Sequence, residues 1–390
     1  MHRPDTARRR PVAAWRAPGQ PHGGHEEATL DALAQRIAML RGSQYAGTFD
    51  AADLPPRNAY LVPDTTLLHA QLAGLDVRGP ADLFGGVVPH RFVATKLVSH
   101  PSVHADAPVP RGWEHTLARR MAQAVLPGFS VFSAGDAAAA FGLLSPLGPV
   151  RFKLARGIGG NGHWRVTTPA ELDEALADLP DGELESHGAS LEQNLDDAVT
   201  FSIGVVECAG QCIAYHGEQR TVDGPHGHEV YAGSTLDVVR GGLDELLAHQ
   251  AWAPVDDPRQ AALARAVRQA RRYDTEMRRS FPGFFASRRN YDVVAGRDAG
   301  GTLRSGVLEQ SWRIGGASPA ELLALEAFAA NPALARVRVS CHEAYGDHAP
   351  PAEATVHYRG NEPRLGPMVK YAVLESAEEF REERMHGHAA

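Results

Sequence analysis

The sequence contains little cysteine, no long apolar run and no excess of positive charge. Its three cysteines, too few for a disulfide framework, suit a reducing compartment, so we expect a cytoplasmic protein. No apolar run approaches the roughly 18 residues that a membrane span needs. The 39 basic and 47 acidic side chains give a net charge of −8, which argues against a surface built for nucleic acid or anionic lipid. No nucleic-acid or membrane partner is therefore expected, and a homodimer is left open.

Lysine is also scarce. Of the 39 basic residues only Lys96, Lys153 and Lys370 are lysines, and the other 36 are arginines. Lysine carries a compact point charge on a slim side chain, which suits a crowded phosphate, whereas arginine offers a planar fork. Each lysine is therefore a candidate phosphate ligand, and chance retention is the alternative.

A length of 390 residues corresponds to two or three domains of about 150 residues each, and the alternation of strand and helix patterns predicts the α/β class. We expect a disordered leader at 1–27, which has no periodicity and no apolar core of a secretory signal. A small N-terminal α/β domain (28–90), two α+β lobes (91–190 and 191–345) and a tail (346–390) follow. Helices are expected at 65–75, 113–126 and 258–280, and as a solvated helix in the Glu-rich stretch 376–384.

A glycine-rich loop separates two strand patterns in the first lobe. The strand 150–155 is followed by a loop with Gly157, Gly159, Gly160 and Gly162, and then by a second strand. Glycines allow backbone amides to approach phosphate oxygens closely. A P-loop or a Rossmann loop would open a helix, so this loop is expected to fold over a nucleotide as a flap, with Lys153 beneath it. A plain glycine hairpin is the alternative.

A hairpin at 290–313 places two acids near one another. Asp292 and Glu309 lie on its two strands, and two carboxylates together with phosphate oxygens are ligands that Mg²⁺ prefers. Arg313 and the run 314–318 follow, where backbone amides could approach an anion. The alternative is that both acids merely pair with arginines such as Arg289 and Arg304.

Together these motifs resemble the ATP-grasp superfamily, over roughly residues 90–330. Members carry one lysine at the start of the first subdomain, here Lys96 in ATKLVSH, and a second before the flexible loop, here Lys153 in RFKLARGIGGNGHW. The resemblance implies that LEQNL is the hinge that meets the adenine, through Glu192, Gln193, Asn194 and Leu195. The metal motif corresponds to Asp292, Glu309 and Ser311, where serine replaces the usual asparagine, which implies weaker or single-metal binding.

The resemblance implies an ATP-grasp fold with a small N-terminal pre-grasp domain, a first lobe that carries the flap and a second that carries the hinge and metal site. The cofactors would be ATP and Mg²⁺, and the partner a small-molecule carboxylate. The implied activity is that of a carbon–nitrogen ligase, in which the carboxylate becomes an acylphosphate that an amine or another nucleophile attacks. Arg313 would orient the carboxylate and Arg220 would lie over the phosphates. A kinase of a small metabolite and a non-catalytic nucleotide-binding protein are the alternatives. The string GVLEQSWRIGGAS is also similar to a bacterial family of unknown function with an ATP-grasp core.

Overall fold

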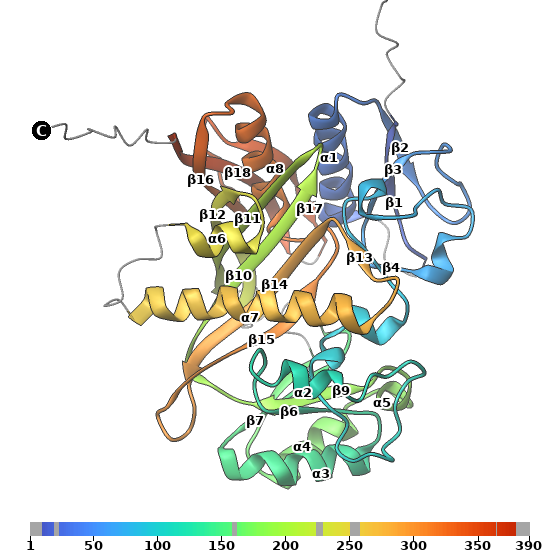
Figure 1. The fold of residues 1–390 in the computed structure, drawn as a ribbon, viewed down its shortest axis with the longest axis vertical. Coiled ribbons are helices and arrows are strands. Elements are labelled where there is room, and N and C mark those ends of the chain that lie inside the picture. The colour runs from blue at the N-terminus through green and yellow to red at the C-terminus, as the bar shows by residue number, and fades with distance from the viewer. Residues whose placement is uncertain are drawn as a thin grey trace, which may run out of the picture.

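The computed structural model describes residues 10–18, 23–157, 162–223, 229–249, 258–363 and 365–379. Helices and strands alternate along them, which confirms the α/β class. Figure 1 shows two principal parts: a small sheet covered by α3 and α4 at the bottom, and a large sheet above it with α7 across its front. No helix in the described ranges is long and apolar enough to cross a membrane.

The N-terminal part begins earlier in the chain than the sequence indicated. Strand β1 (Val12–Trp15) lies between β2 (Tyr45–Phe49) and β3 (Tyr60–Pro63) in a parallel sheet, and helix α1 (Gly24–Arg41) packs through Leu30, Leu33 and Ile37. The prediction of a disordered leader is therefore wrong for residues 12–15 and 24–27. Four consecutive buried residues, VAAW, form a central strand, and so short an apolar run carries no alternation to reveal it.

Short elements connect this part to the next. A separate three-stranded sheet is formed by β4 (Leu67–Leu68), β5 (Gly86–Val88) and β13 (Phe285–Ala286). The helix expected at 65–75 is only a 3₁₀ turn at His69–Leu72. Two further 3₁₀ turns, Arg91–Ala94 and Lys96–Ser99, lead into α2 (Leu117–Met121). That helix is much shorter than the one expected at 113–126.

The small sheet has the order β6-β9-β7-β8, with antiparallel neighbours throughout. Its strands are β6 (Gly128–Val131), β7 (Val150–Leu154), β8 (His163–Val166) and β9 (Ala189–Gln193). Helices α3 (Ala134–Leu144) and α4 (Pro169–Ala177) pack on one face, and Lys153 and Glu192 lie on the other face. Helix α5 (Glu183–His187) precedes β9.

The large sheet has eight antiparallel strands in the order β15-β14-β10-β11-β12-β16-β18-β17. Their bounds are β10 (Asp196–Cys208), β11 (Gln211–Asp223), β12 (Glu229–Arg240), β14 (Arg288–Arg297), β15 (Leu303–Ser311), β16 (Leu334–Tyr345), β17 (Thr355–Glu362) and β18 (Gly366–Glu379). Helix α7 (Pro258–Ser280) confirms the helix expected at 258–280 and covers one face together with α6 (Leu243–Ala248). Helix α8 (Ser318–Ala330) and α1 cover the other face.

The C-terminal part completes this sheet. Strands β17 and β18 pair with each other, and β18 also pairs with β16, so residues 376–379 are strand where a solvated helix was expected. The rest of that Glu-rich stretch lies outside the described residues. A charged sequence can form a strand where, as here, most of its side chains from Leu374 to Glu379 remain exposed.

Candidate functional site

Lys96 contacts three separate segments of the chain. The residue is only 4% exposed, and Thr95 caps the 3₁₀ turn that holds it. Its Nζ lies 3.0 Å from Oε2 of Glu309, donates to the carbonyl oxygen of Gly157 at 3.1 Å, and lies 3.1 Å from Nε2 of His163. Burial next to Lys96 and Lys153 lowers the pKa of His163 to about 4, so this imidazole is neutral at pH 7. The lysine thus joins the glycine loop, β8 and β15.

Lys153 forms a buried group with Glu192 and His100. Nζ of Lys153 pairs with Oε1 of Glu192, and Nε2 of His100 lies 3.2 Å from Oε2 of the same carboxylate. Burial alone would raise the pKa of Glu192, but Lys153 and His100 outweigh it and lower that pKa to about 2. Loss of one partner from a buried ion pair typically costs about 3–5 kcal/mol, so this group fixes the position of β7 relative to β9.

The predicted hinge is where the chain passes from the small sheet to the large one. Glu192 and Gln193 end β9, and β10 begins at Asp196 (Figure 1). Between them Asn194 accepts a hydrogen bond from Nε of Arg151 at 2.7 Å and donates one to Asp196 at 3.0 Å. Leu195 packs against Leu126, Val294 and Leu308. These four residues therefore lie at the junction of the two sheets.

Asp292 and Glu309 are direct neighbours on β14 and β15. Burial, followed by the charge of Glu309, raises the pKa of Asp292 to about 7, although Nε2 of Gln219 donates to its Oδ1 at 2.8 Å. Burial also acts to raise the pKa of Glu309, but the charge of Lys96 outweighs it and lowers that pKa below its ordinary value. The positive charge around this pair is thus too small to stabilise the ionised form of both carboxylates.

The alternative reading of these acids, as partners of Arg289 and Arg304, is wrong. Arg289 pairs with Glu207 at 2.9 Å and with Asp274 at 3.3 Å, and Arg304 pairs with Asp298 at 2.8 Å.

The chemistry of this pair fits a hard divalent cation. The side chain of Glu309 is 40% exposed, so part of it remains open to solvent. Among the described residues no group of three His, Cys, Asp or Glu side chains could hold a metal, and Mg²⁺ commonly uses one or two carboxylates with water and phosphate oxygens. Oγ of Ser311, the third predicted ligand, accepts a hydrogen bond from Nη1 of Arg288 at 3.2 Å. A metal there would lie beside a guanidinium, which weakens the case for Ser311.

The side chains of Arg313 and Arg288 both approach Gly315. A Cβ atom added to Gly315 would meet nothing closer than 3.9 Å, and at that distance it would meet Nη2 of Arg288, Nη1 of Arg313 and Oγ of Ser311. Arg288 is neutralised by a buried ion pair with Glu321 at 2.8 Å, whereas Arg313 donates to the carbonyl oxygen of Ile314 at 2.9 Å. Burial and the charge of Arg288 lower the pKa of Arg313. Because the printed contact of Arg313 is to a backbone carbonyl and not to a carboxylate, its guanidinium is a candidate to bind a small anion.

The remaining predicted site residues are the four glycines of the loop and Arg220. Gly157 and Gly162, the latter with φ of +71°, lie next to Lys96 and Leu154, whereas Gly159 and Gly160 lie outside the described residues. Arg220 does not join the group. It follows Gln219 on β11 and points to the opposite face, where Nη2 lies 2.9 Å from Nδ1 of His342. The role predicted for Arg220 over the phosphates has no support in this geometry and is corrected here.

Sequence reasoning missed four residues of the site, namely His100, His163, Gln219 and Arg288. His100 meets Glu192 across 92 positions and Gln219 meets Asp292 across 73, and no local pattern reveals such contacts. Arg288 stands beside Arg289 in the sequence, and only the alternation of the strand sends one to Glu321 and the other to Glu207. His163 alone had a signal, since it follows the glycine loop directly.

The two sheets, with a cluster of lysines and carboxylates between them, define an α/β protein with a candidate nucleotide site. The chain belongs to the DUF3182 family, described as a protein of unknown function, whose model matches residues 16–372. A search of curated proteins gave no match.

Several solved structures are similar to the chain. D-alanyl-alanine synthetase A from Vibrio cholerae is 12% identical, with a TM-score of 0.47 over 79% of this chain and 90% of that one. Phosphoribosylamine–glycine ligase from Thermotoga maritima is 13% identical, with a TM-score of 0.47 over 93% of this chain and 92% of that one. The ATP-grasp ligase PsnB, complexed with a minimal precursor, is 13% identical, with a TM-score of 0.32 over 78% and 90%.

Proposed function

We propose that the protein is an ATP-grasp ligase that uses ATP and Mg²⁺ to activate a small carboxylate. The observation that carries the proposal is that two of the only three lysines in the chain lie close to a pair of adjacent carboxylates. Four separate segments supply these side chains, and such a convergence of a fixed positive charge with unsatisfied negative charge suits a metal–triphosphate ligand.

The charges suggest how the residues would act. Lys96 and Lys153, which pair with Glu309 and Glu192, would exchange those carboxylates for phosphate oxygens, and Asp292 and Glu309 would hold the metal. When bound, Mg²⁺ would offset the negative charge that spreads over the phosphate oxygens during transfer. The chain's own part is mainly to position the reactants and to supply fixed charge.

Arg313 would bind the carboxylate and orient it toward the γ-phosphate. One carboxylate oxygen would attack that phosphorus, and ADP would leave. An amine would then attack the carbonyl carbon of the acylphosphate, and inorganic phosphate would leave with the bonding electron pair. Carbon–nitrogen bond formation, the domain boundaries other than that of the leader, the cytoplasmic location and a homodimer remain part of the proposal.

Calorimetric titration of ATP and Mg²⁺ into Lys153→Met tests the phosphate role. We expect affinity to fall at least tenfold, because one charge-assisted contact contributes about 1.5–3 kcal/mol. Lys370→Met is the matched control, since Lys370 is also a buried lysine paired with a glutamate, Glu343, at 2.9 Å. Equal losses in the two variants, with both shown to be folded by circular dichroism, would remove Lys153 from the site.

Release of ADP in the presence of pooled small carboxylates distinguishes the alternatives. A ligase should release inorganic phosphate as well as ADP, and the phosphate only when an amine is also supplied. A kinase should release ADP without an amine and release no phosphate, because the phosphoryl group stays on its product. The hydrogen bond from Arg288 to Ser311 favours the third candidate, a non-catalytic binder with a weak metal site. Such a protein would bind ATP and release no ADP with any pool.

A further inference from the structure

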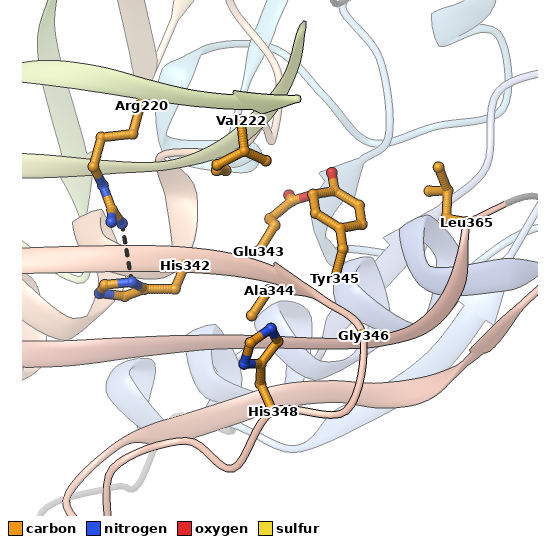
Figure 2. A pocket seen from close by; sticks show the side chains of 10 residues that line it. Arg220, Val222, His342, Glu343, Ala344, Tyr345, Gly346, His348 and Leu365 are labelled. Atoms are coloured by element: carbon orange, nitrogen blue, oxygen red, sulfur yellow. Dashed lines mark hydrogen bonds between the residues drawn. The ribbon is translucent and has the colours of Figure 1, made fainter. Parts of the chain in front are cut away.

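A cleft opens where strands β12 and β16 separate. Their pairing ends at Gly233 and His342; beyond it β12 continues with β11, and β16 continues with β18. The resulting cavity has a volume of about 600 Å³ (Figure 2). Across it, the hydroxyl of Tyr345 donates to the carbonyl oxygen of Tyr231 at 2.9 Å.

Arg220 is held in the wall of this cleft by uncharged acceptors. Its Nη2 lies 2.9 Å from Nδ1 of His342 and 3.4 Å from the carbonyl oxygen of Cys341, and Figure 2 shows the first of these contacts. Gly233 makes this reach possible, because a Cβ at that residue would lie 3.0 Å from Nη2 and 2.0 Å from the oxygen of Cys341.

A chain of hydrogen bonds fixes the tautomer of His342. Ser340 donates its hydroxyl proton to Glu375, so its Oγ must accept from Nε2 of His342, which lies 2.8 Å away. The other ring nitrogen, Nδ1, is then the acceptor that Arg220 needs. Burial, together with the charge of Arg220, lowers the pKa of His342 and keeps the ring neutral. The ring also stacks on Tyr371 with centroids 4.6 Å apart.

The two hydrogen-bond acceptors of Arg220 are uncharged, so neither of them neutralises its guanidinium charge. The carboxylate of the opposite wall, Glu343, is engaged with Lys370 at 2.9 Å. The remaining lining consists of four apolar residues, Val222, Ala232, Ala344 and Leu365, together with Tyr345, Gly346 and His348. A guanidinium fork suits a planar carboxylate, and an apolar wall suits a short hydrocarbon chain.

We propose that this cleft, on the opposite side of β11 from Gln219 and Asp292, is a second ligand site that binds a small organic carboxylate with an apolar chain. Arg220 binds the carboxylate, and His342, Ser340 and Glu375 position Arg220. This second site is separate from the candidate nucleotide site and does not depend on the ligase proposal.

The test is a titration of the full chain with butanoate, followed by the methyl resonances of Val222 and Ala344. We expect saturable shifts that butanamide does not produce, because it lacks the charge. Arg220→Gln should weaken binding about tenfold or more. Arg359→Gln, which removes an exposed arginine from β17 of the same sheet, is the matched control and should leave binding unchanged.

His342→Phe tests the positioning role, since it keeps a ring to stack on Tyr371 but removes the acceptor. It should weaken butanoate binding while thermal unfolding shows the variant to be folded. The proposal is overturned if butanoate causes no saturable shift, if butanamide binds equally well, or if inorganic phosphate binds and butanoate does not. Equal affinities of Arg220→Gln and wild type would also overturn it.

Discussion

Asp292→Asn and Glu309→Gln should change stability in opposite directions, although the two carboxylates are adjacent. Asp292 is ionised at a cost, because burial and Glu309 raise its pKa to about 7. Glu309 instead neutralises Lys96 at 3.0 Å, and Lys96 is only 4% exposed. Removing the first charge relieves repulsion, whereas removing the second leaves a buried ammonium group without its carboxylate.

The magnitude follows from the pKa of Asp292. A pKa raised from 3.8 to about 7 corresponds to about 4 kcal/mol at 1.36 kcal/mol per pKa unit, and solvent screening reduces this to about 2 kcal/mol. A carboxyl group whose pKa is raised in the folded protein destabilises it as the pH rises from 3.8 to 7. Asp292→Asn should therefore stabilise the protein at pH 8, and by less at pH 5, where Asp292 is largely protonated.

Urea unfolding at pH 8 and pH 5 measures both effects. Glu309→Gln should lower the free energy of unfolding by about 3 kcal/mol at pH 8. Both variants should lose Mg²⁺-dependent nucleotide binding in a calorimetric titration. If Asp292→Asn destabilised the protein, or stabilised it equally at the two pH values, the assignment of repulsion between these carboxylates would be refuted.

Three further predictions concern neighbouring residues. Ser311→Asn restores the usual ligand and should lower the Mg²⁺ concentration needed for nucleotide binding; superimposable binding curves would exclude residue 311 from the metal site. The pKa of Glu192, lowered to about 2, contributes stability above pH 4.5 that is lost as the pH falls toward 2, so Glu192→Gln should flatten acid unfolding in this range, and an unchanged profile would contradict the buried pair. ATP with Mg²⁺ should slow amide hydrogen exchange at residues 153–157 and 162–166, and protection confined to other segments would show that the glycine loop is a surface hairpin.

The sequence was most informative where chemistry depends on residue type and local spacing. The scarcity of lysine singled out Lys96 and Lys153, and the alternation around a glycine turn predicted the hairpin that makes Asp292 and Glu309 neighbours. The sequence was least informative where contacts between distant segments determine the position of a side chain. Gln219 and Arg220 are consecutive residues. Only the alternation of side chains along the strand places the guanidinium at His342 and the neighbouring amide at Asp292.

The same limit explains the errors in secondary structure. The strand at Val12–Trp15 forms because β2 and β3 pair on either side of it, and its own four residues carry no periodic signal. Residues 376–379 favour helix by composition, but pairing with β16 makes them strand. In both cases tertiary pairing outweighs local propensity.

The contact between Lys96 and Glu309 has a thermodynamic consequence for the order in which ligands bind. In the empty protein the ammonium group occupies the carboxylate that a metal ion would use. Mg²⁺ alone must displace this internal cation, and ATP alone must draw it away and leave two carboxylates facing its phosphates. Each ligand therefore removes the obstacle to the other, and by reciprocity the gain in affinity is equal in both directions. Such linkage would make the site respond to the metal–nucleotide complex and discriminate against either component by itself.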